Sequence, residues 1–134
     1  MTSSTALPVG SDTVRLVTGV YSPRLTAHGR VGGTVVAWST PGVFMLEGRD
    51  DMAVLWDIRI HPEYLRQGCG SRLFSRAATW AHTKGCGMLK VETQNINVAA
   101  CNFYASQGCE LGGINRFAHP EFLDEVQLLW YKRL

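Results

Sequence analysis

The sequence lacks the patterns that mark membrane, secreted and metal-binding proteins. It has no stretch of about 18 apolar residues that could span a bilayer, and residues 1–11 have neither the basic start nor the apolar core of a secretory signal. Its four cysteines form no C-x-x-C pair and its four histidines no H-x-x-x-H motif, so we expect neither a metal ion nor a redox motif. A cytoplasmic protein with free thiols and no membrane partner is the expectation.

The sequence also lacks a large excess of charge of either sign. Thirteen Lys and Arg residues against eleven Asp and Glu residues leave a formal net charge of +2. Because the basic residues do not cluster, a nucleic-acid partner is excluded. The 134 residues, 46% of them hydrophobic, predict a single domain over 1–134, with 1–12 as a flexible N-terminal lead rich in Ser, Thr, Gly and Pro.

Hydrophobic periodicity predicts an α/β fold. The longest strand candidate is 52–60, whose first five residues are all apolar, as in a strand covered on both faces. The clearest helix is 71–84, and 22–33 is expected to be a turn. Strands and helices alternate in the second half, which predicts right-handed crossovers. The loop before the last strand is long, and loops of that length usually have a function. The other expected elements are strands at 13–20, 33–38, 88–93, 109–112 and 125–132, and a helix at 98–107.

A glycine-containing loop, Arg66-Gln67-Gly68-Cys69-Gly70-Ser71, joins the long strand to the clearest helix. In this position consecutive backbone N–H groups converge beside the positive end of the helix dipole, which makes a binding site for phosphate. The dinucleotide fingerprint fails at Leu73, and the Gly-Lys-Ser/Thr of nucleoside-triphosphate loops is absent. The alternative is that the two glycines only permit a tight turn.

Asn97 and Tyr104 lie seven residues apart in the helix expected at 98–107, with Ala100 between them. Two helical turns separate them, so the three residues share one face, and a slot can form above the small alanine. The alternative is structural: Asn97 caps the helix, and Tyr104 is a half-buried core aromatic.

Three motifs occur in order along the second half of the chain: I-R-I-H-P-E-Y-L-R-Q-G-C-G-S at 58–71, E-T-Q-N-I-N-V-A-A-C-N-F-Y at 92–104, and the turn at Gly108. Over residues 33–134 this pattern resembles the GNAT superfamily of N-acetyltransferases. The runs L-E-G-R-D-D, V-L-W-D-I-R-I-H-P and D-E-V-Q-L-L-W-Y resemble the streptothricin acetyltransferases in particular.

The resemblance implies a mixed, mostly antiparallel twisted sheet flanked by helices, and acetyl transfer from acetyl-CoA to an amine. It assigns the pyrophosphate to the loop Arg66–Ser71, with Gln67, Gly68, Cys69 and Gly70 inside it, and the pantetheine arm to the backbone of Ile58, Arg59 and Ile60. Asn97 matches a cofactor-contacting asparagine, and Tyr104 matches the tyrosine that protonates the departing thiolate. The family loop usually begins with Arg or Gln where this chain has Leu65, with Arg66 one place later.

An acceptor amine must lose a proton before it attacks, so a base or a relaying water is required. Asp57 lies in the central strand and Glu92 near the end of the next, so both are candidates to hold the ammonium and accept its proton. The equally weighted alternative is that each is paired in a salt bridge, Asp57 with Arg59. Weaker candidates on the substrate side are Glu47, Asp50, Asp51, Asp124 and Glu125. Cys69 and Cys101 are expected to be packing residues.

The front of the chain departs from the family, which usually carries a further strand and one or two helices that wall the acceptor pocket. Either the acceptor site is open or a second copy completes it, as in a homodimer. The expected function is that of a streptothricin-type N-acetyltransferase, which acetylates a primary amine of a small cationic antibiotic and so confers resistance to it. The alternatives are acetylation of a protein N-terminus, a lysine or a polyamine, and a non-catalytic acyl-CoA-binding module.

Overall fold

The computed structural model describes residues 12–15, 20–27 and 29–134. Apart from Asp12, which begins the first strand, the expected N-terminal lead over 1–12 lies outside them. The elements are β1 (Asp12–Arg15), β2 (Val20–Ala27), β3 (Gly29–Trp38), η1 (Phe44–Leu46), β4 (Met52–Ile60), η2 (Pro62–Tyr64), α1 (Cys69–Thr83), β5 (Met88–Gln94), α2 (Val98–Ser106), β6 (Glu110–Asn115) and β7 (Gln127–Arg133).

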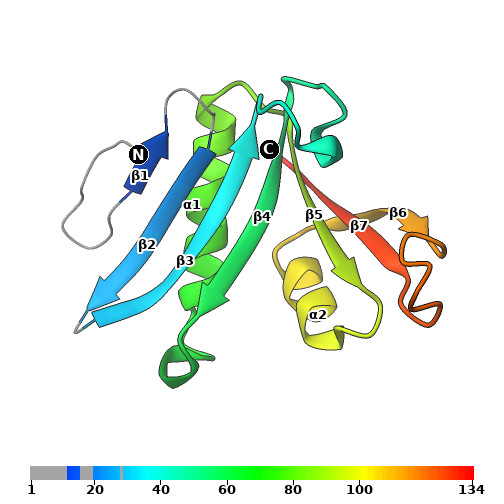
Figure 1. The fold of residues 1–134 in the computed structure, drawn as a ribbon. Coiled ribbons are helices and arrows are strands. Elements are labelled where there is room, and N and C mark those ends of the chain that lie inside the picture. Colours follow the sequence, from blue (N-terminus) through cyan, green and yellow to red (C-terminus); the bar gives the residue numbers. More distant parts are fainter. Residues whose placement is uncertain (1–11, 16–19, 28) are drawn as a thin grey trace.

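Within the described residues, seven strands form one sheet in the order β1-β2-β3-β4-β5-β7-β6. Among neighbouring strands of the described sheet, only β4 and β5 pair in parallel; they are joined through α1, which packs along β3 and β4 (Figure 1). The predicted mixed, mostly antiparallel sheet with flanking helices is therefore confirmed. A second crossover leads through α2 from β5 to β6, which run parallel because each pairs antiparallel with β7, the strand that lies between them.

The prediction of a turn at 22–33 is also wrong. β2 and β3 form an antiparallel hairpin over this region, with Ala27 opposite Gly29. The register with β3 skips Ser22 and Pro23, which is where a residue without an N–H fits a strand. Pairing of Ser22 and Pro23 with β1, and of the residues before and after them with β3, overrides the local turn preference of Ser and Pro.

The long strand and the clearest helix form where they were predicted and build the core. In β4 the residues from Met52 to Leu55 are buried, but Trp56 is 59% exposed, so the fifth apolar residue is not covered. The helix α1 begins at Cys69, two residues before the expected start, because Gly68 in a left-handed conformation (φ 78°) serves as its N-cap. Its buried face is Leu73, Phe74, Ala77, Trp80 and Ala81.

The parallel strands β4 and β5 separate after a short contact. They pair only at Met52 with Met88, Ala53 with Leu89, and Val54 with Lys90. Beyond this point Figure 1 shows the two strands diverging, with α2 beside β5. The register between β3 and β4 also shifts at Trp56, which has no partner there, and such a bulge bends a strand. One edge of β4 beyond Val54 is thus left without a neighbouring strand.

Candidate functional site

Two cavities lie against the diverging part of β4. The first, here called the loop cavity, has a volume of about 670 Å³ and lies at the start of α1. The second, the carboxylate cavity, has a volume of about 400 Å³ and lies between β4 and β5. Both are lined by Ile58, Asn97, Ala100 and Tyr104, so they meet along a common wall. The structure thus brings the slot predicted above Ala100 to the junction of the two cavities.

The glycine loop forms one end of the loop cavity. Arg66 (φ 63°) and Gly68 (φ 78°) both have left-handed backbone conformations, and no side chain caps the first turn of α1. The unpaired N–H groups of a helix start attract anions. Predicted cofactor-binding residues that line this cavity are Ile58, Ile60, Arg66 and residues 68–71.

Three residues of the predicted loop have structural contacts of their own. Gln67 does not line the cavity, because its amide donates a hydrogen bond to the Glu63 carbonyl at 3.2 Å. Gly70 lies inside α1, and a Cβ atom there would meet the Phe103 ring at 3.1 Å. Packing against Phe103 therefore restricts position 70 to a small residue. Cys69 is 4% exposed, as expected of a packing residue.

Asn97 caps α2, as the structural alternative predicts. Its Oδ1 accepts a hydrogen bond from the Ala100 N–H at 3.1 Å. The same side chain borders both cavities, so the capping function and a contact with a bound molecule are compatible.

Tyr104 is 5% exposed and also borders both cavities. Among the described residues its hydroxyl has no hydrogen-bond partner. Burial, with smaller contributions from the charges of Cys109 and Asp57, raises the pKa of Tyr104 to about 12. The hydroxyl therefore keeps its proton throughout the neutral range.

Asp57 has the ion-pair partner that the structural alternative predicts. Its Oδ2 lies 3.0 Å from Nε of Arg59, and both side chains are well exposed to solvent. Asp57 lines the carboxylate cavity, whereas Arg59 lines neither this cavity nor the loop cavity. Of the three residues Ile58, Arg59 and Ile60, only the two isoleucines project toward the loop cavity.

Glu92 lines the carboxylate cavity and is held by three side chains. Its Oε1 accepts from Gln127 Nε2 at 3.0 Å, and its Oε2 accepts from Gln94 Nε2 at 3.0 Å. Nε2 of His119 lies 3.8 Å from the same Oε2. His119 belongs to the long loop before β7, and sequence reasoning singled out that loop but not this residue.

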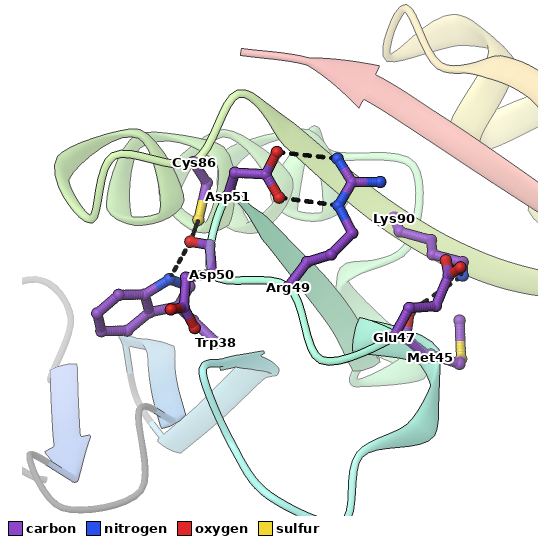
Figure 2. A network of polar contacts seen from close by, with 8 residues as sticks. All are labelled: Trp38, Met45, Glu47, Arg49, Asp50, Asp51, Cys86 and Lys90. Atoms are coloured by element: carbon purple, nitrogen blue, oxygen red, sulfur yellow. Dashed lines mark hydrogen bonds and ion pairs between the residues drawn. The ribbon is translucent and has the colours of Figure 1, made fainter.

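Lys90 is a second residue that sequence reasoning missed, although a lysine inside the apolar strand M-L-K-V was a signal. Its ammonium is buried and donates to the Met45 carbonyl at 3.0 Å and to Glu47 Oε2 at 3.1 Å (Figure 2). Met45 lines the carboxylate cavity. Lys90 therefore fixes one wall of this cavity to β5.

The acidic residues of the 47–51 segment have structural partners. Glu47 pairs with Lys90, and Asp51 pairs with Arg49 at 2.8 Å, which lowers the pKa of Asp51 (Figure 2). The Asp50 carboxylate accepts from Ser39 Oγ at 2.9 Å, and the Asp50 backbone carbonyl accepts from Trp38 Nε1 at 2.7 Å. Glu47, Asp50 and Asp51 line neither the loop cavity nor the carboxylate cavity, and the same holds for Asp124 and Glu125.

The described part of the chain shows no group of three or more His, Cys, Asp and Glu side chains that could hold a metal ion. The four cysteines, all within it, are free thiols. No helix in the described ranges is long and apolar enough to cross a membrane.

The fold, the glycine loop at the start of α1 and the divergence of β4 from β5 agree with one family. Residues 19–109 match the model of the acetyltransferase (GNAT) family. This chain belongs to that family, and the resemblance seen in the sequence is confirmed.

Individual relatives point to one branch of the family. Streptothricin acetyltransferase A of Bacillus subtilis (strain 168) is 33% identical over 82 residues, which are 59% of this chain and 47% of that protein. Streptothricin acetyltransferase of Escherichia coli is 33% identical over 85 residues, covering 61% and 49% of the two chains. This chain therefore spans about half the length of each relative.

A solved structure shows the same arrangement of strands and helices. It is a protein of Bacillus anthracis str. Ames, described as a streptothricin acetyltransferase and crystallised in complex with acetyl coenzyme A. It is 28% identical to this chain, with a TM-score of 0.75 over 87% of this chain and 64% of that one.

Proposed function

We propose that this chain transfers the acetyl group of acetyl-CoA to a primary amine of a small cationic acceptor of the streptothricin kind. The observation that carries the proposal is the joining of two cavities at Tyr104, one beginning at an uncapped helix start and the other bordered by Asp57 and Glu92. An anionic cofactor fits the first cavity, and a cationic amine fits the second. The reacting groups would meet at the shared wall.

Acetyl-CoA is the acetyl donor and binds in the loop cavity. Its pyrophosphate accepts hydrogen bonds from the N–H groups at residues 68–71, where the helix dipole adds a partial positive charge. The edge of β4 beyond Val54 lacks a strand partner on the β5 side, so the pantetheine amides can pair with it like an added strand. Ile58 and Ile60 supply the apolar wall.

The acceptor amine is the nucleophile. An alkyl amine with a pKa near 10.4 is neutral in only about one molecule in 10³ to 10⁴ at pH 7. Asp57 and Glu92 attract the ammonium, and one of them, or a water between them, takes its proton. The free amine then attacks the thioester carbonyl and the C–S bond breaks as the amide forms. The nitrogen loses its second proton in this step, and that proton replaces the one that Tyr104 gives to the sulfur.

Tyr104 donates its proton to the sulfur that leaves. Its hydroxyl is protonated at working pH because its pKa is raised to about 12, and it borders both cavities. The departing thiolate lies in the same poorly solvated space, where burial raises the proton affinity of sulfur as well. The products are free CoA and the acetylated amine.

The streptothricin acceptor is supported by the names of the two relatives at 33% identity. Acetylation of such a compound in the cytoplasm would make this chain a resistance determinant. We also propose that a second copy, in a homodimer, walls the acceptor cavity.

The experiment is an acceptor panel of streptothricin, aminoglycosides, polyamines and lysine peptides, followed by thiol release and product mass. We expect turnover with streptothricin. Turnover with a peptide or polyamine but not with streptothricin would support acetyl transfer from acetyl-CoA but show that the acceptor is a different amine. Acetyl-CoA binding without turnover on any amine would identify an acyl-CoA-binding module instead.

A further inference from the structure

The long loop between β6 and β7 contacts the carboxylate cavity through one side chain. Figure 1 shows this loop at the end of the sheet where β5 finishes and β7 begins, and the register places Gln94 opposite Gln127 there. His119, from the loop, lies 3.8 Å from Glu92 Oε2 and 3.3 Å from Gln94 Nε2. The three side chains form a chain of polar contacts from the cavity to the surface.

Nε2 of His119 faces two polar side chains of β5, Gln94 and Glu92. The amide nitrogen of Gln94 donates one hydrogen to Glu92 Oε2 at 3.0 Å. Its second hydrogen faces Nε2 of His119, which then acts as the acceptor. Glu92 Oε2 lies 3.8 Å from the same nitrogen, so the ring must turn from Gln94 toward Glu92 before Nε2 can take a proton from it.

We propose that His119 is a positioning residue that also receives, through Glu92, the proton lost by the acceptor ammonium. This inference rests on the proposed function and adds a proton route to it. The ammonium gives one proton to the Glu92 carboxylate and becomes the neutral nucleophile. The Glu92 carboxylic acid then passes the proton to Nε2 of His119, and the carboxylate is restored.

The surroundings of His119 suit this transfer. From β5 it is faced by Glu92 and Gln94, and Gln127 of β7 donates to the other oxygen of Glu92. Of these neighbours only Glu92 is titratable, and it is the one that forms an ion pair with a protonated Nε2. The His119 side chain is 31% exposed, which lets it release the proton to water. The Phe122 N–H donates to the His119 carbonyl at 3.0 Å and holds the loop in this turn.

The test is the pH profile of kcat/KM for the acceptor in His119→Gln. Glutamine still accepts a hydrogen bond from Gln94, but it takes up no proton at any working pH. At pH 7 we expect a loss of about 10- to 10²-fold, the lower part of the range for acid–base catalysis. The loss should shrink to about twofold or less near pH 9.5, where the amine deprotonates without help. Tyr104, with a pKa of about 12, remains protonated there.

Two further variants separate proton transfer from loop structure. Glu92→Gln should show the same pH-dependent loss, and the double variant should lose little more than either single one, because both residues serve one route. His82→Gln, at an exposed histidine in the last turn of α1, is the matched control and should follow the parent at every pH. Acetyl-CoA affinity measured by calorimetry should stay within twofold in all variants.

The outcomes that overturn the proposal differ from those that overturn the function. A His119→Gln variant within twofold of the parent at pH 7 would overturn the proton route. A loss of the same size at every pH would also overturn it and leave His119 a structural contact. No turnover by the parent on any amine would overturn the proposed function and the proton route with it.

Discussion

Replacement of Tyr104 by phenylalanine separates catalysis from packing at the centre of the proposed site. The ring of Tyr104 packs 6.1 Å from Phe74 and 5.2 Å from Phe103, measured between ring centroids. Phenylalanine keeps these contacts and removes only the hydroxyl. If that hydroxyl is the general acid, kcat should fall by about 10²- to 10⁴-fold while the acetyl-CoA affinity changes little.

The same substitution should not destabilise the protein. A buried hydroxyl without a hydrogen-bond partner costs about 1 to 3 kcal/mol, and among the described residues Tyr104 has no such partner. Its removal should leave the free energy of unfolding at pH 8 unchanged or raise it by about 1 kcal/mol. Loss of activity together with unchanged or increased stability is the expected signature.

The raised pKa adds a dependence on alkaline pH. Because the pKa of Tyr104 is raised to about 12 in the folded state, the unfolded chain ionises first, near pH 10. The parent therefore loses stability as the pH rises from about 10 to 12, by up to about 3 kcal/mol at 1.36 kcal/mol per pKa unit. Tyr104→Phe lacks this loss, so the stability difference in favour of the variant should grow over that interval.

The assay combines urea unfolding at pH 8 and pH 11 with steady-state kinetics at neutral pH. Cys109, whose pKa burial raises to about 11, loses its proton in parent and variant alike and cancels in the comparison. A kcat within twofold of the parent, with a stability loss above about 1 kcal/mol, would refute the reasoning and make Tyr104 a structural aromatic.

Two other substitutions test the two ends of the site. Gly68→Val should weaken acetyl-CoA binding, measured by calorimetry, by more than about tenfold. Gly85→Val is the control: Gly85 has a similar positive φ and open space around it, so the substitution should lower the stability by a similar amount and leave the affinity unchanged. Equal effects of the two substitutions on affinity would show that the loop is not part of the cofactor site. Asp57→Asn should raise the KM of a cationic acceptor while lowering the free energy of unfolding by less than about 1 kcal/mol, because its pair with Arg59 is exposed; a changed acetyl-CoA affinity with an unchanged acceptor KM would contradict this.

The elements that carry the motifs could be predicted from local sequence. The strand Met52–Ile60 and the helix α2 lie within one residue of their expected bounds, because apolar spacing and terminal glycines act over short distances. The β2–β3 hairpin could not be predicted in this way, since Ser22 and Pro23 favour turns and only pairing with neighbouring strands makes them part of β2.

The residues of the candidate site also fall into two groups: those that local sequence predicts and those that depend on distant partners. Tyr104, Asn97 and Asp57 were found because motif spacing brings them together on neighbouring elements. His119 and Lys90 were missed, because their partners Glu92 and Glu47 lie 27 and 43 residues away along the chain. The packing contact at Gly70 was missed for a related reason: the ring that a side chain there would meet belongs to Phe103, on another helix.

The central claim is acetyl transfer to a cationic amine, and the most direct measurement is product analysis by mass spectrometry after incubation with acetyl-CoA and streptothricin. The account predicts free CoA and an equal amount of streptothricin acetylated on one primary amine, both strongly reduced in Tyr104→Phe. Free CoA without an acetylated amine, or an unchanged amount of product in Tyr104→Phe, would contradict it.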